Sequence, residues 1–333
     1  MPPEEEDDDE ESFGEEKEEE LSRRDFIIFL ARDIAFAVIL VGIVIGALFA
    51  YAQVWPPMVV VESGSMQHSG VKSYLGVIDT GDLVLLQGIG SASDVVTYVQ
   101  GRVTGYETYS NYGDVIVFHP PGASLTVTPI IHRAIVYVEY PSAFGPGVDI
   151  PSLEGFPASE WSWTNFSGSQ TSPAYNLRTI TLQVRSWHTG SESVLSVNFD
   201  LNAVRSRGFL TKGDHNANPE SLPPVPASAI IGKARGELPW FGLIKLTIWP
   251  TTGCCPGGWG DTGRQGAPRN SWDSLATSLL MIPLGIFLAD YGVAFVEKYW
   301  KSYRKKRKEV AASGGEEGTA LEETATESDD APR

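Results

Sequence analysis

The sequence has little cysteine, and the little it has is uninformative about metals. The 333-residue chain contains two cysteines, Cys254 and Cys255, which are adjacent. A structural zinc site needs four ligands and a disulfide framework needs several pairs, so both are excluded. The pair itself is open to three interpretations: two free thiols in a glycine-rich loop, a vicinal disulfide, or a bridge between chains.

Basic residues are also scarce. The chain has 25 of them against 42 acidic residues, a net charge of −17, and residues 1–24 alone hold 13 acidic and three basic residues. A nucleic-acid-binding surface needs a basic patch facing the phosphates, so nucleic acid is not an expected partner. Hydrophobic residues nevertheless make up 42% of the chain, which is enough to bury a core and excludes wholesale disorder.

Two long apolar runs stand out. Residues 34–54 form 21 consecutive positions without a charge, enough for a helix to cross the ~30 Å hydrocarbon core. Trp55-Pro-Pro follows instead of a small-residue cleavage site, which favours an uncleaved signal anchor. The second run, residues 274–296, contains Pro283 and Asp290. An ionisable group inside a span is costly, so its alternative interpretation is a buried amphipathic helix.

The charges that flank the two runs predict the membrane topology. Seven basic residues lie within residues 298–308, and Arg23, Arg24 and Arg32 lie on the N-terminal side of the first run. Basic residues are retained on the cytoplasmic side of a membrane. We therefore expect a multi-pass cell-membrane protein with both termini cytoplasmic and residues 56–272 outside. The acidic tail 1–24 and the tail within 297–333, beyond a basic juxtamembrane segment, are expected to be disordered.

The region between the runs predicts a mainly β domain. Its short apolar stretches are rich in Val, Ile and Thr and are separated by Gly or Pro, and no helical period of useful length occurs. We expect strands at residues 58–62, 82–87, 94–100, 114–119, 130–139, 178–186, 194–199, 229–236 and 241–249. Residues 141–176 are rich in Pro, Gly and Ser and are expected to be a long exposed excursion with a glycosylation sequon at Asn165.

Three residues are candidates for chemistry. Ser65 follows a predicted strand in a Ser-Gly-Ser-Met turn, where its hydroxyl can be exposed. A serine nucleophile needs a base within hydrogen-bond reach, and His132 lies in an apolar strand where its pKa can be tuned. Asp214 lies in a Gly-Asp turn and could orient the histidine. Each has a simpler interpretation: a loop serine, a core histidine and an Asx-turn.

Six blocks in order resemble type I signal peptidases of the archaeal and endoplasmic-reticulum type, in which a histidine replaces the bacterial lysine. The blocks are SGSM (63–66), GDLVLL (81–86), GDVIVF (113–118), IIHRAI (130–135), FLTKGDHN (209–216) and IIGKARGELPWFG (230–242). The resemblance covers roughly residues 34–140 and 207–250. It implies a signal-peptidase-like β catalytic domain flanked by the two transmembrane helices. Residues 141–206 are more than a minimal enzyme of this type needs between the histidine block and the next, and because they include two predicted strands they are interpreted as an inserted β subdomain.

The resemblance also implies roles for residues. Ser65 is expected to be the nucleophile, His132 the general base and Asp214 the acid, while the Ser63 hydroxyl assists the oxyanion hole. The family carries a second aspartate six residues after the first, and here Glu220 stands in its place. Asp214 is preferred because the motif around it is intact, and Glu220 remains the alternative acid. The chain also departs from the family in Gln67-His68-Ser69 after the serine block and in the inserted residues.

The expected function is therefore that of a serine endopeptidase that cleaves signal peptides from secretory and membrane preproteins. The expected partners are signal peptides, the lipid bilayer and, as a further candidate, the protein-translocation machinery; no cofactor or metal is expected. Two alternatives remain. One is a regulatory or self-cleaving membrane protease of the same fold, and the other is a non-catalytic surface binding protein in which the insert acts.

Overall fold

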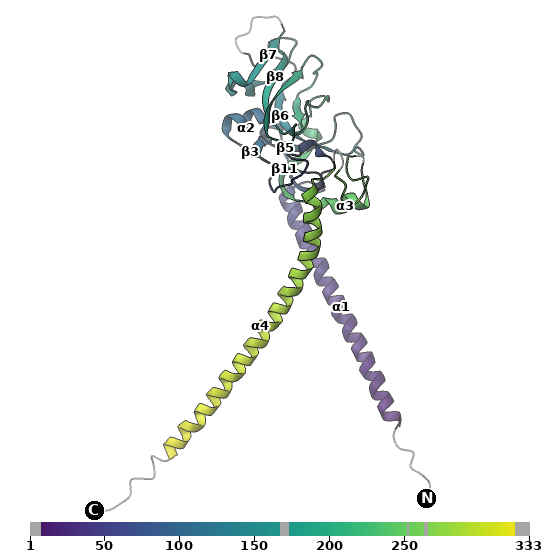
Figure 1. Cartoon of the computed structure of the whole chain (residues 1–333), viewed down its shortest axis with the longest axis vertical. Helices are drawn as coiled ribbons and strands as arrows, with labels where there is room; N and C mark the ends of the chain where they lie inside the picture. Colours follow the sequence, from purple (N-terminus) through teal and green to yellow (C-terminus); the bar gives the residue numbers. More distant parts are fainter. Residues whose placement is uncertain (1–7, 167–172, 252, 263–265, 324–333) are drawn as a thin grey trace, which may run out of the picture. The chain divides into compact units, whose positions relative to one another are not determined.

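A computed structural model describes residues 8–166, 173–251, 253–262 and 266–323. The chain divides into two compact units, Met1–Trp272 and Asp273–Arg333. The first contains a long helix and a β-rich domain, and the second contains most of another long helix (Figure 1).

Both long helices contain a candidate membrane span. Helix α1 covers Asp8–Ala52 and α4 covers Arg269–Glu323. Within them, Arg24–Ala52 and Arg269–Arg304 are long and apolar enough to cross a membrane. Their large apolar side chains are exposed to the surroundings rather than packed in a core, as the surface of a lipid-facing helix would be. The two predicted spans are thus present as candidates, and their orientation stays a prediction.

The helices extend beyond the predicted runs into the acidic segments. Helix α1 begins at Asp8 and α4 continues to Glu323, whereas both tails were expected to lack structure. Glu, Lys and Ala favour helix, and an existing helix lengthens without the cost of a new nucleus. Residues 1–7 and 324–333 lie outside the described residues.

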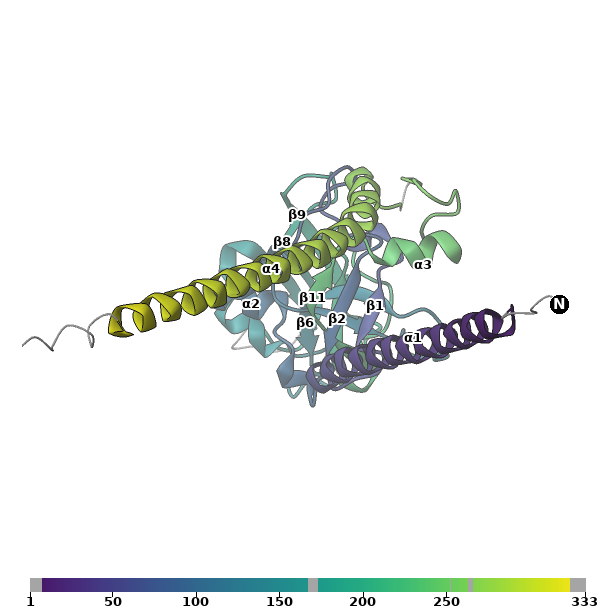
Figure 2. The ribbon, with the colours of Figure 1, turned by 90° about the horizontal axis from the view of Figure 1, so that it is seen from below.

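The β-rich domain is built on a curled six-stranded sheet with strand order β1-β2-β11-β5-β6-β10, and every pair is antiparallel. The strands are β1 (Met58–Val60), β2 (Leu83–Gln87), β5 (Val115–Phe118), β6 (Ile130–Val138), β10 (Gly208–Lys212) and β11 (Ile230–Leu238). Figure 2 shows β1 beside β2 at the border of the sheet. The Gly88 N–H donates to the carbonyl oxygen of Ala52 at 2.7 Å, which ties the last residue of α1 to the end of β2.

Strand β5 lies inside the sheet and is buried on both faces. Val115 and Val117 belong to one core cluster, while Ile116 and Phe118 belong to another on the opposite face. This explains why its sequence is continuously apolar rather than alternating. Strand β6 is its neighbour, and its residues continue both cores.

The predicted insert does form β structure. Strands β7 (Trp161–Asn165), β8 (Leu177–Ser186) and β9 (Ser193–Asp200) make a three-stranded antiparallel sheet in that order. Its buried side chains, such as Ile180 and Leu182, share one core cluster with Ile135 and Val138 of β6. The insert therefore packs on the main sheet as part of the same unit.

The first part of the insert differs from the expectation of a long exposed excursion. Ile150, Leu153 and Phe156 are buried around a 3-10 turn, η3 (Pro151–Gly155), and Trp161 begins β7. These apolar residues are spread thinly among Pro, Gly and Ser, and they anchor the segment in the core. Asn165 ends β7, but Ser167 of the sequon lies outside the described residues.

Two predicted strands are wrong. The stretch 94–100 contains the end of η2 (Ala92–Asp94) and the start of α2 (Tyr98–Thr104), because Thr97 and Gln100 form a capping box. The stretch 241–249 forms α3 (Gly242–Ile248), which buries residues one helical turn apart. Two short strands, β3 (Glu107–Thr108) and β4 (Asn111–Tyr112), and two further 3-10 turns, η4 (Ala158–Glu160) and η5 (Ala227–Ala229), complete the domain.

Candidate active site

The candidate nucleophile lies on a short turn that follows β1. Ser65 is the middle residue of η1 (Gly64–Met66), a 3-10 turn. The Met66 side chain is 1% exposed and is part of the core, so it anchors the turn from below. Ser65 itself is half-buried, and its Oγ lies 3.4 Å from the Oγ of Ser63, the residue expected to assist the oxyanion hole.

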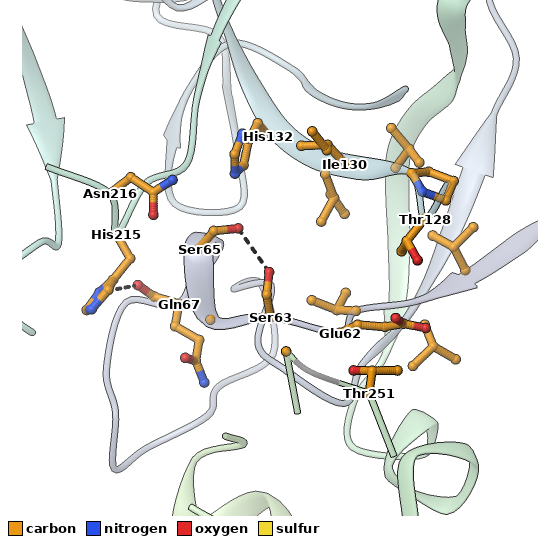
Figure 3. A pocket seen from close by; sticks show the side chains of 18 of the residues that line it. Glu62, Ser63, Ser65, Gln67, Thr128, Ile130, His132, His215, Asn216 and Thr251 are labelled. Carbon is orange, nitrogen blue, oxygen red and sulfur yellow. Dashed lines mark hydrogen bonds between the residues drawn. The ribbon is translucent and has the colours of Figure 1, made fainter. Parts of the chain in front are cut away.

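A cavity of about 1140 Å³ opens over this turn (Figure 3). One wall is β1 with the residues that follow it, and the facing wall is the segment 128–132 at the start of β6. The loop 215–220 closes the wall near Ser65. The residues shared with the sequence-based site are Ser63, Ser65, His132 and Glu220.

His132 is the third residue of β6 and pairs with Ile116 of β5. It is 4% exposed, and burial lowers the pKa of its imidazole from 6.5 to about 4. The ring is therefore neutral near pH 7 and able to accept a proton. A Cβ added to Gly213 would lie 3.0 Å from His132 Nε2 and 2.5 Å from the Ser65 carbonyl oxygen. The histidine and η1, which we call the nucleophile turn, therefore adjoin the same glycine.

Glu220 is the carboxylate that lies against the histidine. Its Oε1 is 3.1 Å from His132 Nδ1, which is ion-pair distance. The two groups are not aligned as a hydrogen bond, and Nδ1 has no hydrogen-bond partner among the described residues. The Glu220 side chain is 26% exposed and burial raises the pKa of its carboxyl. A small rotation of this carboxyl would satisfy Nδ1, and catalytic hydrogen bonds are often loose before substrate binds.

Chain geometry explains how Glu220 reaches this position. The Glu220 N–H donates to the Thr211 carbonyl oxygen at 3.1 Å, so the loop after β10 folds back onto β10. Strand β10 is paired with β6, where Thr211 lies opposite Ala134 and Lys212 opposite Arg133. The folded-back loop therefore delivers Glu220 to the histidine two residues along β6.

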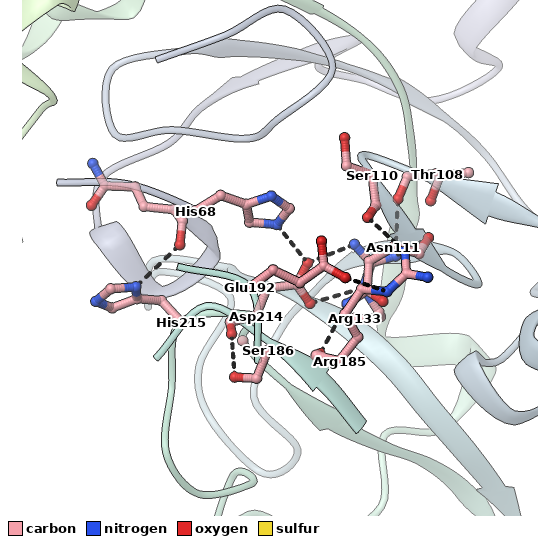
Figure 4. A network of polar contacts seen from close by, with 12 residues as sticks. His68, Thr108, Ser110, Asn111, Arg133, Arg185, Ser186, Glu192, Asp214 and His215 are labelled. Carbon is pink, nitrogen blue, oxygen red and sulfur yellow. Dashed lines mark hydrogen bonds and ion pairs between the residues drawn. The ribbon is translucent and has the colours of Figure 1, made fainter. Parts of the chain in front are cut away.

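Asp214, the preferred acid on sequence grounds, has other partners. Arg133 donates from Nε to Oδ1 at 2.8 Å and from its terminal nitrogen to Oδ2 at 2.7 Å, and His68 Nε2 lies 3.2 Å from Oδ2 (Figure 4). Burial raises the pKa of Asp214, but the Arg133 charge and hydrogen bonds outweigh it and hold this pKa well below its usual range. No described hydrogen bond or ion pair joins Asp214 to His132. The geometry thus differs from the expectation and favours the alternative, Glu220.

Arg133 was not singled out in the sequence, although it is the most deeply buried charge near the site. Its side chain is 0% exposed, and its second terminal nitrogen donates to the backbone carbonyl oxygens of Thr108, Asn111, Tyr112 and Gly113. A buried guanidinium needs a carboxylate, and Asp214 supplies it. The available signal was an arginine inside an apolar strand, directly after the histidine.

His68 and Lys212 were also missed. The His68 ring stacks on Trp187 with ring centroids 3.5 Å apart and an interplanar angle of 2°. Lys212 is 2% exposed and its Nζ donates to the Gly213 carbonyl oxygen at 2.9 Å, while burial lowers the pKa of its ammonium to about 8. No local pattern in the sequence indicates the stacking, because Trp187 comes from the insert.

Cys254 and Cys255 are joined by a disulfide and are both buried. Of the three interpretations, the structure contains the vicinal disulfide. The preceding Gly253 lines the cavity and packs on the carbonyl oxygen of Glu62, so this segment is part of the cavity wall. Among the residues that the structure describes, no group of three or more His, Cys, Asp or Glu side chains is placed to hold a metal ion.

Comparison of the chain with protein families, with characterised proteins and with solved structures finds no match.

Proposed function

We propose that this protein is a membrane-bound serine endopeptidase that removes signal peptides from exported precursors. The observation that carries the proposal is the meeting of Ser65, the neutral buried His132 and the Glu220 carboxylate at one cavity. A hydroxyl, a neutral base and an orienting carboxylate are the parts that a serine protease needs, in whatever order the chain supplies them.

The chemistry assigns one role to each group. His132 Nε2 takes the proton from Ser65 Oγ, and the oxygen attacks the carbonyl carbon of the scissile bond. The same imidazole then gives that proton to the leaving amine, and water releases the acyl group by the reverse sequence. The Ser63 hydroxyl, 3.4 Å from Ser65 Oγ, is close enough to stabilise negative charge on the oxyanion.

The two carboxylates divide the remaining work. Glu220, whose Oε1 lies 3.1 Å from His132 Nδ1, orients the imidazole and stabilises its charged form during the reaction. Asp214 neutralises Arg133 and so supports the backbone on which His132 lies. The proposed acid is thus Glu220, whereas the sequence motif favoured Asp214.

The cavity suits an extended peptide. Strand β1 is an edge strand, because among the described strands it pairs with β2 alone, and it forms one wall of the cavity. Its free backbone groups can pair with a substrate strand. Val59, Ile130 and Ile131 supply apolar surface within the mixed lining of the cavity, which can receive the small uncharged residues expected at the end of a signal peptide.

The candidate spans support a substrate that is already in the membrane. An enzyme and a substrate anchored in the same bilayer meet at high effective concentration and with part of the orientation prepaid. Helix α1 ends at Ala52, only a short segment before β1 and Ser65.

The decisive experiment mixes membranes that contain the protein with a secretory precursor and measures cleavage. We expect wild-type cleavage and its loss in Ser65→Ala and in His132→Ala, with Ser93→Ala, a serine at the surface, as the matched control. Cleavage that persists in Ser65→Ala would refute the proposal. Ser65-dependent cleavage of the chain itself, with none of the precursor, would instead identify a self-cleaving protease.

A further inference from the structure

The insert reaches the candidate active site through one turn. Residues 187–192 join β8 to β9, and we call this segment the insert turn. His188, within it, lines the same cavity as Ser65. The insert therefore contributes to the wall of this cavity and is not confined to the outer surface of the domain.

Backbone contacts tie the insert turn to the loop that carries Asp214. The Trp187 N–H donates to the Asp214 carbonyl oxygen at 3.0 Å, and the hydroxyl of Ser186, the last residue of β8, donates to the same oxygen at 2.8 Å (Figure 4). His188 Nδ1 lies 3.1 Å from the carbonyl oxygen of His215. The insert thus contacts two consecutive peptide groups of this loop.

The Asp214 loop is in turn bonded to the nucleophile turn. The His215 N–H donates to the Ser65 carbonyl oxygen at 2.9 Å. His215 Nδ1 lies 3.1 Å from the Gln67 carbonyl oxygen (Figure 3). Any displacement of residues 213–215 is therefore passed to Ser65 through backbone hydrogen bonds.

A side-chain contact also joins the insert turn directly to the segment that follows Ser65. Trp187 is 7% exposed and His68 is 8% exposed, and their rings lie nearly parallel with centroids 3.5 Å apart. His68 follows Ser65 by three residues, and its other partner is the Asp214 carboxylate. The indole thus covers the ring that links the nucleophile turn to Asp214, and it excludes water from that link.

We propose that Trp187 is a positioning residue for Ser65, and that the insert turn is part of the catalytic apparatus. The inference rests on the proposed function for its kinetic consequence, whereas the packing it describes can be measured without any substrate. Trp187 does not line the cavity, so its effect is on the placement of the nucleophile and not on substrate binding.

The kinetic test uses Trp187→Ala in the full-length protein in membranes. We expect kcat for precursor cleavage to fall about 10²-fold with KM changed little, since small misplacements of a reacting group have effects of this size. Trp187→Phe keeps an aromatic plane over His68 and should restore most of the rate. Trp163→Ala is the matched control, because Trp163 lies in β7 of the same insert and contacts Trp161. We expect it to cleave as the wild type does.

The structural test uses the ring signals of His68 in NMR spectra of the detergent-solubilised full chain, assigned with His68→Asn. We expect the signals to be shifted by the stacked indole, to move in Trp187→Ala and Trp187→Leu, and to stay close to wild type in Trp187→Phe and Trp163→Ala. Trp187→Leu keeps the apolar bulk without the ring, so it replaces Trp187→Ala if that variant does not fold.

The outcomes separate the two proposals. A wild type without Ser65-dependent cleavage, but with His68 signals that respond to Trp187, rejects the peptidase and keeps the placement of the insert turn. Unchanged His68 signals in a folded Trp187→Leu overturn the positioning role. So does a Trp187→Leu variant that cleaves at the wild-type kcat, or a loss of rate in which KM rises while kcat is kept.

Discussion

Two carboxylates six positions apart, Asp214 and Glu220, have opposite surroundings. Asp214 is 3% exposed and is held by Arg133 and His68, whereas Glu220 is 26% exposed and faces His132. A buried ion pair loses most when one partner is removed, because the other charge is left without compensation. The partly exposed Glu220 carboxylate beside the imidazole is the one that the proposed mechanism uses. We therefore expect substitution of Glu220 to lower the cleavage rate and substitution of Asp214 to lower the free energy of unfolding.

For Glu220→Gln we expect the rate of precursor cleavage to fall roughly 10²- to 10⁴-fold, because the amide can no longer stabilise the charged imidazole of His132. The thermal unfolding temperature should stay near that of the wild type. Glu139→Gln, at an exposed position, is the control for loss of a carboxylate. Full activity in Glu220→Gln would remove Glu220 from the site.

For Asp214→Asn we expect the folded state to lose about 3–5 kcal/mol, because the fully buried Arg133 is left without its counter-charge. Unfolding of the detergent-solubilised protein with denaturant measures this. An Asp214→Asn protein as stable as the wild type but unable to cleave would return the orienting role to Asp214.

The pH dependence of cleavage reports on His132. The imidazole must be neutral to accept the Ser65 proton, and burial lowers its pKa to about 4. The rate constant kcat/KM should thus stay level as the pH falls through 6.5, the ordinary pKa of an imidazole. It should decrease at lower pH, first as Glu220, whose pKa burial raises, takes up a proton, and then near pH 4 as His132 does. Stability measured at each pH separates this limb from acid unfolding. A decrease of kcat/KM already near pH 6.5 would mean that His132 is more exposed to water in the working enzyme than in the structure.

Sequence reasoning reached part of this site. Ser65, Ser63 and His132 were identified from their motifs, and the structure brings them to one cavity. The sequence favoured Asp214 as the acid, whereas the carboxylate beside His132 is Glu220, because the hydrogen bond to Thr211 folds the loop back. Motif integrity reports that a residue matters, and says nothing about which neighbour its side chain meets.

At the scale of elements, the segment between β1 and β2 contains two buried carboxyl groups, those of Asp79 and Asp82. Asp82 accepts from the Asp79 N–H at 2.7 Å and from the Trp240 N–H at 2.8 Å, and its own carbonyl oxygen accepts from the Val61 N–H at 2.9 Å. Burial first, and then nearby carboxylates, raise the pKa of Asp79 to about 8. Burial is also the main cause that raises the pKa of Asp82 to about 7 and that of Glu237 to about 7.

These raised pKa values predict that stability falls with rising pH. Between about pH 4, where the unfolded chain ionises, and about pH 8, where Asp79 does so in the folded state, the folded protein holds more protons. The stabilisation is complete at the lower limit and is lost progressively as the pH rises, until the folded-state pKa values near 7 to 8 are passed. Its slope is about 1.4 kcal/mol per pH unit for each proton involved.

Asp79→Asn tests this with a neutral side chain of the same shape. We expect a shallower loss of unfolding free energy between pH 5 and 8, and a variant more stable than the wild type at the alkaline end of this window, where Asp79 is ionised in the wild type. Denaturant titrations at several pH values measure it, with Glu139→Gln as the exposed control. A pH dependence identical to the wild type would show that Asp79 is not desolvated.

The elements themselves were predictable where hydrophobic alternation is strong. Strands β6, β8 and β9 lie within one residue of the predicted ends. The stretches that became α2 and α3 carry the same β-branched residues, and there the capping box at Thr97 and packing one turn apart outweighed propensity. The docking of the insert on β6 depends on contacts far apart in the sequence, which no local pattern reveals.

For the whole molecule, the two candidate spans lead to a topology prediction. With Arg24–Ala52 and Arg269–Arg304 both crossing the membrane, the two termini lie on the same side. The basic residues beside them indicate the cytoplasmic side. Protease added outside intact cells should digest the β-rich domain and leave epitope tags at both termini intact. A digested C-terminal tag would show that the second helix does not cross, and the protein would then have one anchor.

The bond between the Ala52 carbonyl oxygen and Gly88 limits how far the nucleophile can stand from the bilayer. Thirteen residues lead from Ala52 to Ser65, a reach of at most roughly 45 Å if fully extended, and the pairing of β1 with β2 uses part of it. The length of chain after α1 thus sets a maximal distance between Ser65 and the end of the candidate span. Under the proposed function, peptide bonds at one height above the membrane surface would enter the cavity, and bonds of the same chemistry farther along an exported chain would stay out of reach.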